Sequence, residues 1–214
     1  MVSTGLGELD QILGTGYPDR SAILIVGPPG IGKEALGYWF TQVGLAQTDS
    51  CLYVTLLAVS EVLEDLRAFH MDGPSQPEWL ASEGSRVTCN VNDLVGLSFS
   101  IKQTLQKYGD KRARIVTDVL STLLVLNPLE TIYRFLSQLL AEVKRYNAVL
   151  LATLEDGMHQ SNVLAAMEQM FDGVMELRYF EEGLRIVPLL RIRKMRGVLL
   201  TPGYFRFSFT NGKM

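Results

Sequence analysis

The chain has 214 residues, of which 47% are hydrophobic and 20% charged, a balance that excludes a disordered chain and allows one large core. Its 20 basic and 23 acidic residues give a formal net charge of −3, so any binding to nucleic acid or to an anionic membrane has to be local. No apolar run approaches the roughly 18 residues of a membrane-spanning helix. Glu8 and Asp10 arrive too early for a secretory signal, so we expect a cytoplasmic protein without membrane insertion.

In chain order, strands and helices alternate over most of the length. The apolar periodicity and the turn residues predict a short helix, then a strand that is apolar at every position, and then further helices and strands. The predicted elements are helix 3–13 with Ser3 or Thr4 as its cap, strand 22–26, helix 33–46, strand 51–57, helix 60–71 capped by Ser60, surface loop 73–84, helix 94–108, strand 113–119, helix 130–146 and strand 148–153. This alternation is typical of a mainly parallel sheet with helices on both faces.

The last third of the chain changes character. Residues 172–177, 184–193 and 204–209 read as strands that are joined by short turns, which predicts an antiparallel extension of the sheet. No linker or repeat interrupts the pattern, so residues 1–214 are expected to form a single domain. Cys51 and Cys89 lie in apolar surroundings and are expected to be buried free thiols, without a disulfide or a zinc site.

A phosphate-binding loop follows the first apolar strand and precedes a helix. Its seven residues are Gly27, Pro28, Pro29, Gly30, Ile31, Gly32 and Lys33. The glycines allow successive backbone N–H groups to turn toward a phosphate, the helix N-terminus adds a favourable dipole, and the lysine reaches the β- and γ-oxygens. The sequence therefore predicts a nucleoside triphosphate site at this turn.

The residue after the lysine is Glu34, where the motif normally has the Ser or Thr whose hydroxyl binds Mg²⁺. A carboxylate beside the phosphates repels them by roughly 4 kcal/mol at about 4 Å and an effective dielectric near 20, unless a cation intervenes. Either Glu34 binds the metal itself or the site has weakened Mg²⁺ handling. The second expected metal ligand is Asp118, at the carboxyl end of the apolar strand 113–119.

These residues together resemble one domain of the KaiC type, a branch of the RecA-like P-loop ATPases that is common in archaea and bacteria. The resemblance covers the whole chain and is carried by the lead-in from Ser3 to Gly16, the phosphate loop, Asp118, and the segment Lys194-Met195-Arg196-Gly197. It implies a RecA-like α/β sandwich, ATP as the cofactor, and a ring of like subunits. In such rings Lys194 and Arg196 project toward the nucleotide of the neighbouring subunit.

One departure from the family bears on catalysis. In the family, the strand after the phosphate-loop helix ends in two glutamates that activate the attacking water. Here residues 54–58 read Val-Thr-Leu-Leu-Ala, and the first carboxylate is Glu61. A general base has to reach the water directly or through one more water. We therefore assign no catalytic residue and predict very slow hydrolysis.

Several features remain open at this stage. The basic cluster around Arg191, Arg193, Lys194 and Arg196 is either a solvated strand face, the inter-subunit contact that the resemblance implies, or a weak DNA-phosphate footprint. Thr153 is either a γ-phosphate sensor or an ordinary strand-end residue. Glu155, Asp156 and His159 fall in the following loop, which either faces the nucleotide or the ring centre or is solvated.

Three functions follow from these interpretations. The first is an ATP-binding regulatory or scaffold protein with impaired or absent hydrolysis, whose partner is a second copy or another RecA-like ATPase subunit. The second is a working ATPase with an unusual base, Glu34 or Glu61. The third is a RecA-like recombination accessory that binds DNA, which the net charge of −3 makes the least favoured.

Overall fold

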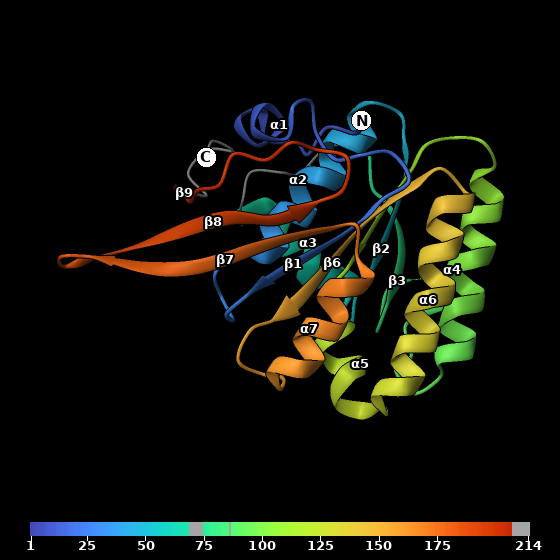
Figure 1. The fold of residues 1–214 in the computed structure, drawn as a ribbon. Coiled ribbons are helices and arrows are strands. Elements are labelled where there is room, and N and C mark those ends of the chain that lie inside the picture. Colours follow the sequence, from blue (N-terminus) through green and yellow to red (C-terminus); the bar gives the residue numbers. More distant parts are fainter. Residues whose placement is uncertain (69–74, 86, 207–214) are drawn as a thin grey trace.

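The computed structural model describes residues 1–68, 75–85 and 87–206, drawn in colour in Figure 1. The helices are α1 (Gly7–Leu13), α2 (Lys33–Ala46), α3 (Val59–Ala68), α4 (Leu94–Tyr108), α5 (Leu120–Leu126), α6 (Leu129–Arg145) and α7 (Ser161–Met170). The strands are β1 (Ala22–Gly27), β2 (Ser50–Val54), β3 (Glu78–Ala81), β4 (Val87–Thr88), β5 (Ala113–Thr117), β6 (Ala148–Glu155), β7 (Gly173–Glu182), β8 (Arg185–Met195) and β9 (Phe205–Arg206).

The described strands form one sheet in the order β4-β3-β2-β5-β6-β1-β7-β8-β9. All pairs from β4 to β7 are parallel, and the pairs β7–β8 and β8–β9 are antiparallel, so β8 alone among the described strands runs in the opposite direction. Strand β6 lies between β1 and β5, so the carboxyl ends of these three strands are neighbours at one edge of the sheet. The β7–β8 hairpin continues past that edge as a long arm (Figure 1).

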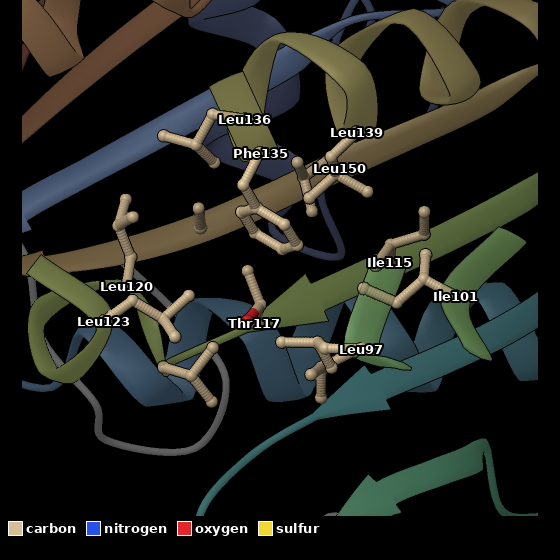
Figure 2. Close-up of a pocket in the computed structure, with 13 residues that line it drawn as sticks. Leu97, Ile101, Ile115, Thr117, Leu120, Leu123, Phe135, Leu136, Leu139 and Leu150 are labelled. Atoms are coloured by element: carbon tan, nitrogen blue, oxygen red, sulfur yellow. The ribbon is translucent and has the colours of Figure 1, made fainter. Parts of the chain in front are cut away.

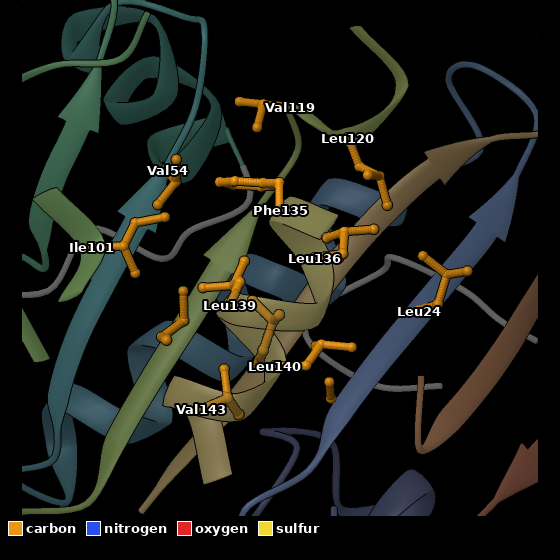
Figure 3. Packing of buried hydrophobic residues seen from close by; sticks show 14 of the residues in the cluster. Leu24, Val54, Ile101, Val119, Leu120, Phe135, Leu136, Leu139, Leu140 and Val143 are labelled. Atoms are coloured by element: carbon orange, nitrogen blue, oxygen red, sulfur yellow. The ribbon is translucent and has the colours of Figure 1, made fainter. Parts of the chain in front are cut away.

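Helices cover both faces of the sheet because successive residues of the buried strands point to opposite sides. On β1, Leu24 packs with α4, α5, α6 and α7, whereas Ile23 and Ile25 pack with α1, α2 and α3. Figure 3 shows the first of these cores, where residues of α6 such as Leu136 and Leu139 meet the sheet. The predicted α/β sandwich, mainly parallel with antiparallel C-terminal strands, is confirmed.

Several element predictions need correction. Segment 73–84, expected as a surface loop, contains β3, which pairs with β2 through Leu52 and Glu78. Helices α5 and α7 had no prediction, and β4 falls where Val87 and Thr88 gave a strand-like context. The predicted N-cap residues of α1 and α3 were wrong as well. Helix α1 has Leu6 at its N-cap position with no side-chain hydrogen bond, and α3 begins before Ser60, where the carboxylate of Glu61 accepts the N–H of Ala58 at 2.7 Å.

Strand β2 ends at Val54 rather than at residue 57, and α1 begins at Gly7 rather than at residue 3, whereas other boundaries are closer to those predicted. The hairpin strands β7 and β8 are longer than expected, and their turn lies at residues 183–184, one residue later than the predicted turn at Glu182 and Gly183. Parts of two predicted elements, residues 69–71 and 207–209, lie outside the described residues. Cys51 and Cys89 are both buried and unpaired, as predicted. Within the described ranges, no helix is long and apolar enough to cross a membrane.

Candidate nucleotide-binding site

The phosphate loop connects the carboxyl end of β1 to the first residue of α2. Gly30 and Gly32 have φ angles of 72° and 93°, in the left-handed region that glycine reaches without steric cost. The N–H of Ile31 donates to the carbonyl of Pro28 at 3.4 Å, which closes the turn. No side chain caps the N-terminus of α2, so its first N–H groups remain available to an anion.

Lys33 is the first residue of α2, and its side chain is fully buried. Its Nζ donates to the carbonyl oxygen of Pro28 and to Oε2 of Glu155, each at 2.9 Å. Oε1 of Glu34 lies 3.9 Å from the same Nζ. The ammonium group that should meet the phosphates is therefore engaged with a carboxylate from another strand.

Glu155 is the last residue of β6, where it pairs in register with Gly27 of β1. Its backbone N–H donates to Oγ of Ser121 at 2.8 Å, and the next N–H, from Asp156, donates to the carbonyl of Gly27 at 2.9 Å. We expected Glu155 in a loop. The strand runs two residues beyond Thr153 because Leu154 is fully buried, and an apolar residue at that position was the available signal.

Asp118 directly follows β5 and thus lies at the same edge, as predicted. Its Oδ2 accepts the hydroxyl of Thr55 at 2.7 Å, and its N–H donates to the carbonyl of Val54 at 3.3 Å. The pKa of Asp118 is raised to about 6, mainly by burial; the hydrogen bond from the Thr55 hydroxyl lowers it and the carboxylate of Glu34 raises it. The carboxylate of Asp118 is thus held where ionisation is costly until a cation is present.

Glu34 and Asp118 suit Mg²⁺ as a pair of carboxylates rather than as a complete cage. Within the described ranges, no group of three or more His, Cys, Asp or Glu side chains is arranged to hold a metal ion. Mg²⁺ commonly takes one or two carboxylates and completes its shell with water and phosphate oxygens. Two acids that interact electrostatically at the end of the phosphate loop fit that requirement.

The comparisons with known proteins agree with this geometry. The family model for the KaiC ATPase matches residues 2–214. The chain belongs to the KaiC family of ATPases. A UPF0273 protein of Aeropyrum pernix is 24% identical over 225 residues, which cover 92% of this chain and 85% of that protein. The resemblance inferred from the sequence is thereby confirmed, and with it a place among the RecA-like P-loop ATPases, which bind nucleotides.

Two other relatives match over smaller shares of their length. A UPF0273 protein of Methanopyrus kandleri is 40% identical over 55 residues, which cover 26% of this chain and 22% of that protein. A DNA repair protein RadA of Treponema pallidum is 26% identical over 205 residues, which cover 90% of this chain and 40% of that protein. The chain thus spans less than half of the length of both relatives.

Relative to the KaiC family, the site lacks an acid at the end of β2. The residues after that strand include Leu57, which is 40% exposed, and Thr55, whose hydroxyl is bound to Asp118. Glu61, one of the two unusual bases considered, accepts the N–H of Ala58 at the start of α3. Its carboxylate therefore has a structural role at a helix N-terminus.

The KaiC-type segment 194–197 lies far from the phosphate loop of its own chain. Because β8 is antiparallel, its last residue Met195 pairs with Gly173 at the start of β7, at the edge opposite the phosphate loop. Lys194 donates there to three carbonyl oxygens at the end of α7, those of Glu168, Gln169 and Phe171. Arg196 is 77% exposed, with Nη1 3.6 Å from Oδ1 of Asp172. Only a second subunit could bring this segment to a nucleotide.

The rest of the basic cluster pairs mainly within the chain. Arg193 forms an ion pair with Glu168 at 2.5 Å, and Arg191 donates to the hydroxyl of Tyr204 at 3.3 Å. These contacts agree best with the first of the three interpretations, a solvated strand face whose charges are locally balanced. Both guanidinium groups already have acidic partners, and both side chains are only about half exposed. Little unpaired positive charge is therefore left to bind DNA phosphates.

A separate cavity lies inside the core, beneath α4, α5 and α6 (Figure 2). Its lining is apolar except for Thr117, and its volume of about 20 Å³ has room for about one water molecule. Such a space offers no group that would hold a phosphate. The polar edge around Lys33, rather than this cavity, is the candidate site.

Proposed function

We propose that this chain is a single KaiC-family domain that binds ATP in a regulatory or scaffold role, with impaired or absent hydrolysis. The observation that carries the proposal is the phosphate loop, whose two left-handed glycines precede the uncapped N-terminus of α2 and the buried Lys33. Residues 27–33 would hold the phosphates, and Glu34 and Asp118 would hold Mg²⁺. The metal would supply the positive charge that the two carboxylates and the phosphates otherwise lack.

The proposal of impaired hydrolysis rests on the missing base. Phosphoryl transfer depends on a positioned water and on electrostatic stabilisation, and the segment after β2 supplies no group for the first. Glu34 remains a second candidate base, because its carboxylate lies 3.9 Å from Lys33 Nζ. A turnover comparable to that of ordinary ATPases that is lost in Glu34→Gln would establish that alternative.

The test is calorimetry with ATP and ADP, with and without Mg²⁺, on the wild type and on Lys33→Ala. We expect the wild type to bind and Lys33→Ala to lose at least about 100-fold in affinity, because a charge-assisted bond to phosphate worth about 3 kcal/mol is removed. Phosphate release at saturating ATP should stay close to the uncatalysed background. Equal affinity for the two proteins would refute the site.

The proposed partner is a second copy, or another RecA-like subunit, that approaches head to tail. The segment with Lys194 and Arg196 lies at one edge of the sheet and the phosphate loop at the other, so a head-to-tail contact, repeated by rotation around a ring, joins the two. The β7–β8 arm adds exposed apolar side chains, among them Leu184 and Ile186. We place this assembly in the cytoplasm.

Size-exclusion chromatography with light scattering checks the assembly. We expect a mass above that of the 23.8 kDa monomer at high protein concentration with ATP, and a shift toward monomer in Arg196→Ala. Arg193→Ala is the matched control, because its guanidinium is already paired with Glu168 of α7 in the same chain. A monomer at all concentrations, with and without ATP, would count against this part of the proposal.

A further inference from the structure

The position of the Lys33 ammonium group has a consequence for phosphate binding. The side chain is fully buried, and an ammonium group has three N–H donors. One donor is used by the carbonyl of Pro28 and a second by Oε2 of Glu155, each at 2.9 Å. A phosphate that approaches the loop therefore finds its lysine already bound to an anion of the protein.

We propose that Glu155 is an internal ligand of Lys33 that a phosphate has to displace, and that it thereby sets the affinity of the site. This inference rests on the proposed function and assigns a new role to a residue at the end of β6. Oε2 of Glu155 lies where a phosphate oxygen would meet Nζ of Lys33. When a nucleotide binds, a phosphate oxygen then replaces the carboxylate of Glu155 as the partner of Lys33.

The backbone around Glu155 explains why the carboxylate stays at this position. The N–H of Glu155 is held by Ser121 Oγ, and the N–H of Asp156 is held by the carbonyl of Gly27, the first residue of the phosphate loop. The residue is thus fixed on both sides, and only its side chain has freedom. With 27% of that side chain exposed, the carboxylate can rotate into solvent when a phosphate arrives.

The charges around Lys33 strengthen the competition. Oε1 of Glu34 lies 3.9 Å from the same Nζ, so the buried lysine faces two carboxylates before any phosphate is present. Removing the charge of Glu155 weakens the bond that holds one lysine donor and also removes a like charge beside the phosphates. Both effects act in the same direction, and we expect them together to tighten phosphate binding about tenfold.

The experiment compares Glu155→Gln with Asp156→Asn by calorimetry, using magnesium pyrophosphate and magnesium ATP as the two probes. Asp156 is the adjacent residue and is exposed, so its change removes the same charge from the same segment without touching Lys33. We expect about tenfold tighter binding of both probes in Glu155→Gln and less than about threefold in Asp156→Asn. Equal affinities for the two variants would overturn the proposal. Pyrophosphate separates this effect from any contact to the base.

A second measurement keeps this inference separate from the proposed function. Thermal unfolding without nucleotide is measured for Lys33→Met, Glu155→Gln and the double variant, since a contact between two side chains makes their effects non-additive. If Glu155 is the partner of Lys33, the double variant should melt several degrees above the value that the two single shifts predict by addition. Additive shifts would refute the internal ligand even if ATP binds. Non-additive shifts with no binding by any variant would leave the pair in place and refute the nucleotide site.

Discussion

Replacing Arg114 with methionine should lower the free energy of unfolding by about 3–5 kcal/mol, the largest effect expected for a single change outside the phosphate loop. At this chain length such a loss corresponds to a fall in Tm of roughly 10 °C. The reason is that Arg114 is a fully buried charge in the middle of β5 with every contact supplied by the protein. Removing it leaves several acceptors buried without a donor.

The contacts of Arg114 join three parts of the chain that are distant in sequence. Its guanidinium donates to Asp49 Oδ2 at 2.8 Å, to Gln47 Oε1 at 2.9 Å, and to the carbonyls of Ser3 at 2.7 Å and Phe40 at 3.1 Å. It also lies 4.6 Å from the ring centroid of Phe40. Gly44 leaves the necessary room, because a Cβ there would come within 2.3 Å of the arginine side chain.

Two comparisons make the Arg114 prediction specific. Arg134→Met removes an arginine that pairs with Glu130 while both side chains are about three-quarters exposed, so it should change stability by less than about 1 kcal/mol. Asp49→Asn combined with Arg114→Met should recover part of the loss, since the uncompensated carboxylate of Asp49 is then also removed. Chemical denaturation of the four proteins measures these differences. Equal losses in Arg114→Met and Arg134→Met would contradict the prediction.

The core of the fold was predictable because the central strands carry nearly continuous apolar runs, which in β1 extend over every position. Strands β1, β5 and β6 are buried on both faces, and that pattern is visible in the sequence. Strand β3 was missed because it has four residues, its first two are only half-buried, and it lies near the edge of the sheet. Helix α5 was missed because it has only seven residues. So short a segment does not show the helical periodicity that would separate its buried side from its exposed side.

The candidate site was predictable as a motif but not as a set of contacts. The loop and Asp118 could be named because each follows an apolar strand. The partner of Lys33 could not, because Glu155 comes from a strand that is distant in sequence and reaches the lysine only through the parallel pairing of β1 with β6. Likewise, the sequence identifies the segment with Lys194, but only the antiparallel direction of β8 shows that it lies at the opposite edge.

Replacing Asp118 with asparagine should stabilise the metal-free protein at pH 7, by roughly 2 kcal/mol. The carboxylate lies in a buried position, and its pKa is raised from 3.8 to about 6. Folding at pH 7 therefore has to desolvate an ionised group, which lowers the stability of the folded protein. Asparagine keeps an oxygen that can accept the hydroxyl of Thr55, now bonded to Asp118 at 2.7 Å, and carries no charge. A residue of a binding site is expected to lower the stability of the metal-free protein when its charge is compensated only by a bound cation.

The stabilisation expected for Asp118→Asn depends on pH, because the pKa of Asp118 is raised in the folded protein. Between pH 4 and pH 6 the folded protein binds a proton at Asp118 that the unfolded chain has already released, so the contribution of this group to stability falls as the pH rises through that window. Asparagine does not titrate, so the advantage of Asp118→Asn should be largest at pH 7 and vanish near pH 4. Urea denaturation in EDTA measures it, with Asp156→Asn as the control for removing one carboxylate from an exposed position. An advantage independent of pH would mean that burial does not raise the pKa of Asp118, and the cation would then have no unfavourable charge to relieve.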